Sequence, residues 1–378
     1  MTGELGRRGF LRTTVAGAAL SCAGVRPAAG QGATATVQVP TVDRLEALVL
    51  IDSSQDIFLA PQRVNGVVAQ RARGTGGFPR PLHNEWGLSL LLTSERAGEA
   101  GGPRTTLLDF GFTPEALLNN MDRLGVDPRR IGTLVLSHGH YDHFGGLIGF
   151  LRRHGDSLPA ELTLYAGGED NFCHRWSGAP GQPAQQLGDF GVLDRRELRE
   201  HRVEVVLADQ PTIVADHAFT TGTIPLSGFE RVLPNALVEY AGRAGLGCDA
   251  RHFAPAELQG RVVQDEHHHE HATCFNLRDR GLVVITSCGH RGLANSVRRA
   301  QEVSGVRRLH AVVGGFHLGP APADYVARTV AELKALEPDA VVPMHCSGVG
   351  FVNAMREQMP DRLVLSSTGT RLLFGGGA

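Results

Sequence analysis

The stretch SHGHYDHFGGL, residues 137–147, contains four ionisable side chains within six residues: His138, His140, Asp142 and His143. An apolar run of strand length precedes it, and a segment of helical character follows it. His138 and His140 are two residues apart, so in an extended segment that leaves a strand they point to the same side. Two imidazoles on one side can hold a divalent cation at about 2.0–2.1 Å. Asp142 and His143, on the following turn, are placed to reach a second cation.

Two neighbouring cations would explain why the stretch is so rich in ligand-type side chains. Cations about 3.5–4 Å apart can share a hydroxide and lower its pKa towards neutrality, which provides a nucleophile without a Ser or Cys. In this interpretation Asp142 ligates a metal and orients the nucleophile, and His140 is the other residue with a catalytic role. The alternative is a polar turn with solvated histidines. The order of the four side chains, directly before Gly145 and Gly146, favours a metal site.

Composition restricts the class of protein. The chain has 378 residues, 42% hydrophobic residues, 48 glycines and a formal net charge of −2. This balance is typical of a loop-rich α/β protein and not of a helical bundle or a disordered chain. No basic stripe is present, so nucleic acid is not an expected partner. No feature of the sequence indicates an oligomeric state.

The first 32 residues have the three parts of an export signal. Arg7 and Arg8 stand before Phe10-Leu11, a short apolar run follows, and the segment ends in an Ala-rich stretch. The paired arginines predict export in folded form through the twin-arginine machinery, to the periplasm or the medium. The apolar run is too short for stable membrane insertion. The prediction is a signal at residues 1–32 and a catalytic domain at 40–378; the alternative is the Ala-rich N-terminus of a cytosolic protein.

Five cysteines lie beyond this predicted signal: Cys173, Cys248, Cys274, Cys288 and Cys346. Their spacing does not suggest a disulfide framework. An odd number in an oxidising compartment leaves at least one thiol free, buried or bound to metal.

The order of apolar segments predicts a layered α/β fold. Apolar runs of strand length occur at residues 45–51, 87–93, 106–109, 131–136, 162–165, 203–207, 219–224, 282–286, 309–313 and 340–342. Helical spacing occurs at residues 114–124, 144–153, 294–303 and 323–336. The first of these helices has clear ends, because Thr113 is a typical N-cap, Pro114 suits the first position and Gly125 is a typical stop. Strands come first and then alternate with helices, twice, which predicts two sheets packed face to face with helices outside.

HGHYDH matches the HxHxDH signature of the metallo-β-lactamase superfamily, and the similarity extends over most of residues 45–370. The segment LLDFGFTPEALLNNMDRLGVDPRRIGTLVLSHGHYDHFGGL resembles that superfamily's Asp-bearing strand, helix and metal loop in order. GLVVITSCGHRGLANSV, VVGGFHL and VPMHCSG resemble the branch of metal-dependent hydrolases labelled as 7,8-dihydropterin-6-methyl-4-(β-D-ribofuranosyl)aminobenzene-5'-phosphate synthase-like. The resemblance implies an αββα sandwich of two mixed sheets with helices outside.

The resemblance also implies roles for two further residues. Asp109, in LLDFG, would support the metal loop by orienting a ligating imidazole. Its alternative role is that of a capping or turn residue. His345, in VVPMHCSG, matches the superfamily's last histidine, a ligand of the second metal.

The middle ligands depart from the superfamily pattern, which has a third histidine and then an aspartate that bridges both metals. VVITSCGH supplies Cys288 and His290 where the strand before that aspartate is expected. In one register Cys288 is the bridging ligand, since zinc accepts sulfur at about 2.3 Å, and the third histidine is His269 or His271. In the favoured register His290 is the third histidine, His317 lies near the bridging position and Cys288 lies behind. The alternative for the cluster at 267–271 is a solvated loop.

These observations predict a di-metal hydrolase that uses a metal-bound hydroxide on a small ester, phosphoester, lactone or related substrate. Zinc is the expected metal, and iron or manganese also suit the His/Asp donors. The alternatives are a pterin-phosphate synthase or transferase of the same fold, a di-iron oxidoreductase, and a metal-binding protein without turnover. The Gly/Pro-rich segment 166–190 is either a substrate lid or an ordinary surface loop; it carries Asp170, His174, Arg175 and Trp176. Arg175 and Arg291 are candidates for gripping an anion.

Overall fold

A mixed sheet of nine strands forms one half of the molecule. The computed structural model describes residues 36–375 except 73, 76–79, 179–180, 183–185, 234–235, 241–245, 256–257 and 259–261, so the predicted export signal lies outside the described residues. The strand order is β11-β8-β7-β6-β5-β2-β20-β4-β3. In chain order the strands are β2 (Arg44–Ile51), β3 (Gln62–Val64), β4 (Val67–Arg71), β5 (Ser89–Glu95), β6 (Arg104–Leu108), β7 (Ile131–Leu136), β8 (Leu162–Ala166), β11 (Val203–Leu207) and β20 (Thr370–Gly375). β6, β7, β8 and β11 are parallel, so their C-terminal ends lie at one edge.

A second mixed sheet, of seven strands, forms the other half. Its order is β12-β13-β16-β17-β18-β19, with β1 paired to β16. The strands are β1 (Thr41–Val42), β12 (Thr212–Val214), β13 (Ala218–Thr220), β16 (Thr273–Leu277), β17 (Gly281–Thr286), β18 (Leu309–Gly314) and β19 (Ala340–Pro343). β17, β18 and β19 are parallel, so the residues that follow these three strands lie side by side.

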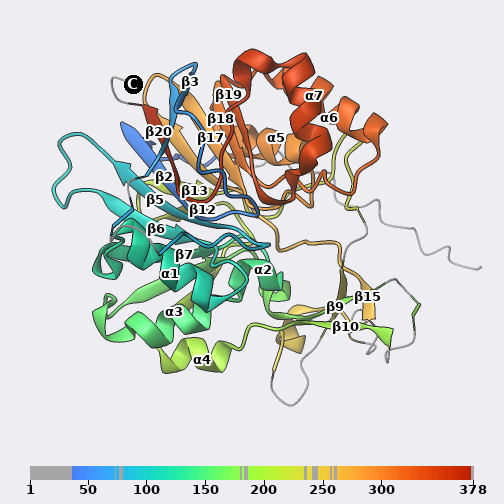
Figure 1. Cartoon of the computed structure of the whole chain (residues 1–378). Coiled ribbons are helices and arrows are strands. Elements are labelled where there is room, and N and C mark those ends of the chain that lie inside the picture. Colours follow the sequence, from blue (N-terminus) through green and yellow to red (C-terminus); the bar gives the residue numbers. More distant parts are fainter. Residues whose placement is uncertain are drawn as a thin grey trace, which may run out of the picture. The chain divides into compact units, whose positions relative to one another are not determined.

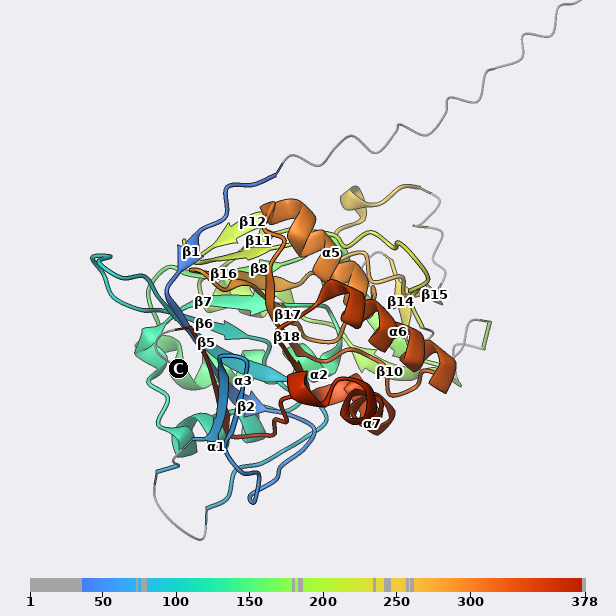
Figure 2. The ribbon, with the colours of Figure 1, turned by 90° about the horizontal axis from the view of Figure 1, so that it is seen from above.

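Helices cover the outer face of each sheet (Figure 1). α1 (Pro114–Leu124), α3 (Leu147–His154) and α4 (Arg195–Glu200) lie beside the nine-stranded sheet. On the other sheet, α5 (Leu293–Ser304), α6 (Ala323–Leu336) and α7 (Gly348–Gln358) follow one another across the outer face (Figure 2). The short α2 (Tyr141–Phe144) lies within the metal-loop sequence. The predicted αββα sandwich of two mixed sheets is therefore confirmed.

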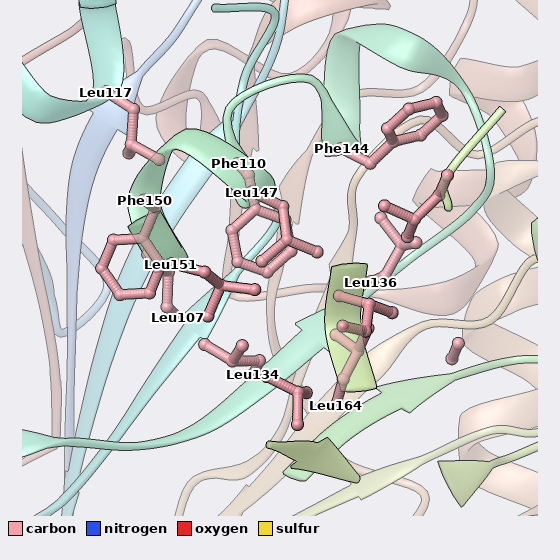
Figure 3. Packing of buried hydrophobic residues seen from close by; sticks show 14 of the residues in the cluster. Leu107, Phe110, Leu117, Leu134, Leu136, Phe144, Leu147, Phe150, Leu151 and Leu164 are labelled. Atoms are coloured by element: carbon pink, nitrogen blue, oxygen red, sulfur yellow. The ribbon is translucent and has the colours of Figure 1, made fainter. Parts of the chain in front are cut away.

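Three apolar clusters correspond to the three interfaces between these layers. Alternation along β2 illustrates the principle, since neighbouring side chains of a strand point to opposite faces. Leu45 and Ala47 pack between the sheets, whereas Leu48 and Leu50 pack under the helices of the first half. Figure 3 shows this helix-side cluster, where Phe150 and its neighbours from α3 meet leucines of β6, β7 and β8. The third cluster lies under α5, α6 and α7.

Several local predictions agree with the structure. The helix at 114–124 has the predicted bounds; Thr113 accepts a hydrogen bond from the Ala116 N–H, and Gly125 has left-handed backbone angles. The helix at 323–336 also has the predicted bounds. The segment predicted as one helix at 144–153 belongs to two helices, which are separated by Gly145 and Gly146. These glycines approach the backbone of Phe112 and Phe110 too closely for any side chain.

The predicted long surface loop at 166–190 is wrong. This segment supplies β9 (His174–Ser177) and β10 (Gly188–Gly191) to a four-stranded sheet of order β10-β9-β14-β15. The other two strands are β14 (Leu237–Glu239) and β15 (Val262–Gln264). The sequence did not indicate β16 and β20 as strands, nor α4 and α7 as helices.

The five cysteines within the described residues divide into one disulfide and three thiols. Cys173 and Cys248 are joined across a sequence separation of 75 residues. Cys274, Cys288 and Cys346 are free and buried. The spacing did not predict the pair, but the odd count correctly predicted a free thiol. Among the described residues, no helix is long and apolar enough to cross a membrane.

Candidate metal centre

The metal loop is held in place by Asp109. β6 and β7 are parallel neighbours, so Asp109 at the end of one lies beside Ser137 at the end of the other. The fully buried Asp109 carboxylate accepts hydrogen bonds from the Ser137 N–H (2.8 Å), the Ser137 hydroxyl (2.7 Å) and His143 Nδ1 (2.7 Å). Because His143 donates through Nδ1, its Nε2 is left as a free lone pair. The structure thus places Asp109 where the sequence analysis predicted.

One group of potential metal ligands consists of His138, His140 and His290. Their ligand atoms all lie within 4.8 Å of one another, and all three residues are buried. His138 Nδ1 is 2.9 Å from the Ser137 hydroxyl, which fixes the ring. Among the described residues, Nε2 of His138 and Nε2 of His140 are buried and have no hydrogen-bond partner. Such orphaned nitrogens are costly unless a ligand satisfies them.

A second group consists of Asp142, His143 and His345. His345 Nε2 lies 3.3 Å from His143 Nε2 and 3.3 Å from Asp142 Oδ2, and His143 Nε2 lies 3.8 Å from the same carboxylate oxygen. Metal–ligand bonds of 2.0–2.1 Å in a tetrahedron place ligand atoms about 3.3–3.4 Å apart. The two separations of 3.3 Å match this spacing, and the third, 3.8 Å, is longer. The Asp142 Oδ1 atom is buried and has no hydrogen-bond partner among the described residues.

His345 is positioned by residues that the sequence analysis missed. Its Nδ1 lies 2.9 Å from the Ser53 hydroxyl, and its N–H donates to Asp52 Oδ1 over 2.7 Å. Asp52 follows β2 directly, as Asp109 follows β6. The sequence signal for both residues is a polar side chain directly after an apolar run. The sequence analysis applied this signal to Asp109 and not to Asp52.

The favoured register had predicted Cys288 behind the ligands. In the structure, Cys288 instead lies between the two groups. Its sulfur lies within 4.8 Å of ligand atoms of both His138 and His143, one from each group. It also groups with His290 and His317, and His317 Nδ1 is 3.8 Å away. The sulfur therefore lies close to donors of both groups.

The cluster at residues 267–271 is not a solvated loop. His267, His269 and His271 are all at most 1% exposed. His269 Nδ1 is 2.7 Å from Asp170, and its Nε2 accepts the Gly139 N–H over 3.0 Å. His271 Nε2 donates to the Leu136 carbonyl over 3.0 Å. His269 and His271 thus brace the metal loop from outside, instead of supplying the third histidine.

His267 belongs to a further group that sequence reasoning overlooked. His140, Asp265 and His267 offer ligand atoms within 4.8 Å of one another. Asp265 is also the partner of the fully buried Arg175, whose Nε donates to it over 2.7 Å. Burial favours the protonated carboxyl, but His267 and Arg175 outweigh this effect and hold the pKa of Asp265 well below its usual range. Asp265 is therefore an anion that neutralises Arg175 beside the metal centre.

The proposed lid and anion-binding arginines are not supported. Arg175 is buried and also donates to the carbonyls of Asp170 and Cys173. Arg291 is 6% exposed, and it donates to the carbonyls of Ile224 and Glu266. Both guanidinium groups brace the chain. In β9, His174 and Trp176 stack on one another at 4.4 Å between ring centroids.

The donor set fits divalent metal ions. Burial, together with neighbouring imidazoles, lowers the pKa of His138, His140 and His290 well below the ordinary value. These rings are neutral at physiological pH, as a metal ligand must be. Imidazole, carboxylate and thiolate donors around one centre are a combination that zinc accepts.

Two aromatic side chains lie at the margin of the centre. Trp86 is 60% exposed, and its ring centroid is 5.0 Å from that of His345. Phe190 is partly exposed and lies 5.2 Å from His140. Each therefore flanks a different ligand group and presents an apolar face next to it.

Comparisons with known proteins agree with this geometry. Residues 100–280 match the family model of the metallo-β-lactamase superfamily. This region of the chain is therefore similar to the metallo-β-lactamase superfamily. A solved structure, that of Tm1679, described as a metal-dependent hydrolase of the β-lactamase superfamily, aligns with a TM-score of 0.61 at 22% identity, covering 86% of this chain and 98% of that one. This superfamily fold supports divalent metal binding and a metal-dependent, hydrolase-like function.

Two relatives come from Methanocaldococcus jannaschii. One is named 7,8-dihydropterin-6-methyl-4-(beta-D-ribofuranosyl)-aminobenzene-5'-phosphate synthase; it is 25% identical over 291 residues, which cover 77% of this chain and 90% of that protein. The other, the uncharacterized protein MJ0448, is 25% identical over 246 residues, which cover 64% of this chain and 78% of that protein. The known proteins that this chain resembles thus include a named synthase.

Proposed function

We propose that this chain is a di-metal hydrolase, with zinc as the metal, acting on a small ester, phosphoester, lactone or related molecule. The observation that supports the proposal most strongly is the convergence of two sets of buried donors, each containing atoms without a partner in the described chain. Iron or manganese are the alternative metals for the His and Asp donors.

The two groups would hold one ion each. His138, His140 and His290 would hold the first ion, and Asp142, His143 and His345 would hold the second; Cys288 lies between the two groups. When bound, the two cations supply Lewis acidity and lower the pKa of a water molecule.

The remaining residues act by orientation and by charge. Asp109 holds His143 with Nε2 towards the centre, and Ser53 does the same for His345. Asp142 presents one carboxylate oxygen to its histidine neighbours, and the other oxygen is available to orient the attacking nucleophile. Burial of the whole set excludes bulk water, which strengthens these electrostatic interactions.

A second candidate is a synthase or transferase that acts on a pterin-like phosphate. It is favoured by the name of the M. jannaschii relative and by Trp86 and Phe190, whose flat faces suit an aromatic substrate. A protein that binds metal without turnover is the third outcome to be distinguished.

The test uses the purified full chain. Metal content is measured, and turnover is assayed on phosphodiester, lactone, thioester and β-lactam probes. His140→Ala is expected to abolish turnover and retain the circular dichroism spectrum of the fold. His268→Ala is the matched control, because His268 is exposed in the neighbouring histidine cluster. Unchanged rates in His140→Ala would refute the mechanism, and bound zinc without turnover on any probe would favour the binding protein.

We also propose that the chain is exported by the twin-arginine machinery. The Arg7-Arg8 pair and the Cys173–Cys248 disulfide support this, since stable disulfides are typical of oxidising compartments. The double variant Arg7→Lys, Arg8→Lys is expected to remain in the cytosolic fraction, while the unchanged chain reaches the periplasm. Equal export of both would contradict the proposal.

A further inference from the structure

Two of the three free thiols in the described part of the chain face each other at the edge of the metal centre. Cys288 follows β17 and Cys346 follows β19, and these strands flank β18 in the parallel part of the sheet. Their sulfurs are 3.1 Å apart. The residues are 3% and 4% exposed, so both thiols are buried. Neither the hydrolytic role proposed above nor the fold requires two thiols in contact.

The contact across β18 depends on a glycine. Gly315 follows β18, between the two cysteines, and a Cβ at this position would come within 2.9 Å of the Cys346 sulfur and 2.2 Å of the Ser287 carbonyl oxygen. Any side chain there would therefore displace Cys346. The sulfur of Cys346 also accepts the His317 N–H over 3.2 Å and donates to the Cys288 carbonyl over 3.5 Å. The backbone and these hydrogen bonds therefore hold the two sulfurs in contact.

The distance between the sulfurs distinguishes two chemical uses of the pair. Two thiolates on one zinc ion, with bonds of about 2.3 Å in a tetrahedron, lie about 3.8 Å apart. A disulfide has a sulfur–sulfur distance of about 2.05 Å. The observed 3.1 Å lies between these values, so a shift of about 1 Å converts the contact into a covalent bond.

The two uses exclude each other at Cys288. Its sulfur groups with ligand atoms of His138 and His143, and a sulfur held in a disulfide is no longer a thiolate donor. Cys346 is the residue directly after His345, and its sulfur groups with Cys288 and a ligand atom of that histidine. Formation of a disulfide between the two cysteines would therefore displace atoms of both ligand groups of the centre.

We propose that Cys288 and Cys346 are a redox pair whose closure to a disulfide competes with metal binding. In the reaction, one thiol attacks hydrogen peroxide, giving a sulfenic acid and one water molecule. The second thiol attacks this sulfur, the disulfide forms, and a second water molecule leaves. The pair is oxidised by two electrons and the peroxide is reduced by two, so the sum is two thiols plus peroxide giving a disulfide and two waters.

The remaining thiol offers an internal control. Cys274 lies in β16, and burial raises the pKa of its thiol. None of the ligand groups named above contains it. Peroxide should therefore leave Cys274 unmodified, as long as the protein stays folded.

The test follows the covalent bond and the metal separately. Metal-free and zinc-loaded full-length protein are treated with hydrogen peroxide, free thiols are blocked with iodoacetamide, and the digest is mapped by mass spectrometry. We expect a linked peptide pair containing Cys288 and Cys346 in the metal-free protein, and at least tenfold slower linkage with zinc bound. Oxidised protein should bind zinc at least tenfold more weakly in competition with a chromophoric chelator.

Variants separate the pair from a general effect of oxidation. Cys346→Ser should retain the same zinc affinity before and after peroxide, while Cys274→Ser should behave as the unchanged chain does. If Cys346→Ser does not fold, the peptide map of the unchanged chain still shows whether Cys288 and Cys346 become linked. Absence of the linked peptide in a protein that binds zinc would overturn the proposal, as would a linked form with unaltered affinity.

The inference rests on the proposed metal centre, yet the two can fail separately. Failure of the centre shows as absence of zinc from the fully reduced protein. Failure of the redox pair shows as absence of the linked peptide in protein that binds zinc normally.

Discussion

Replacing Asp109 by Asn should weaken metal binding without disturbing the fold. The carboxylate of Asp109 accepts from the Ser137 N–H on one oxygen and from the Ser137 hydroxyl and His143 Nδ1 on the other. An amide can keep an oxygen towards the Ser137 N–H, but it then turns its NH₂ group towards His143. Two donors would face each other, so His143 must carry its proton on Nε2, the atom that faces the metal centre.

The magnitude follows from the hydrogen bond that is lost. A hydrogen bond to a charged group contributes about 1.5–3 kcal/mol, and loss of such outer partners typically reduces metal affinity about 10- to 100-fold. Asp109 has a φ of 56°, a left-handed conformation that Asn also tolerates, so the backbone need not rearrange.

The assay is competition for zinc with a chromophoric chelator, with circular dichroism as the check on folding. Asp279→Asn is the matched control, because Asp279 has a φ of 59° but is exposed and far from the ligands in the β16–β17 turn. We expect the zinc dissociation constant to be 10- to 100-fold larger in Asp109→Asn and unchanged in Asp279→Asn. Affinity within twofold of the unchanged chain would refute the argument that Asp109 sets the tautomer of His143.

Three further predictions concern stability and substrate binding. Arg175→Met removes the guanidinium partner of the buried Asp265 carboxylate, and should lower the free energy of unfolding in urea by about 3–5 kcal/mol; a loss below 1 kcal/mol would contradict this role. Replacing Cys173 and Cys248 together by Ser should cost about 2–4 kcal/mol in the same measurement, and equal stability would argue against the disulfide. Trp86→Ala should raise KM about 3- to 10-fold for aromatic substrates and leave kcat unchanged; an equal change for aliphatic substrates would remove its proposed role.

Local patterns predicted the layers of the fold because an element that is buried on one or two faces has regularly spaced or continuous apolar residues in its sequence. β7 and β17 are apolar on both faces, and α1 carries cap residues at both ends, so these elements were recognised. β20 pairs with β2, more than 300 positions away in the chain. No local pattern encodes such a partner, and a short segment beside a Gly-rich end is weak evidence for a central strand.

The metal loop was recognised because its donors are close in sequence, whereas other parts of the site are assembled from distant segments. Asp52 reaches His345 across 293 positions, and Arg175 reaches Asp265 across 90. Such pairs become visible only when the strands that carry them are aligned. The prediction of Arg175 as an anion-binding side chain was wrong for this reason: its charge is already neutralised by a carboxylate that the sequence places far away.

The histidine cluster shows why residue type alone could not assign the ligands. His267, His269 and His271 are all buried, but His268 between the first two is exposed and Glu270 between the last two is buried. The cluster therefore has no strict alternation from which its burial could be predicted. Their roles differ because different ring nitrogens are engaged: His269 uses both, His271 donates from Nε2 to the chain, and only His267 groups with His140. An imidazole can ligate a metal only through a nitrogen that is neither protonated nor already accepting. The ligand set therefore follows from the hydrogen bonds around each ring, and these depend on the tertiary fold.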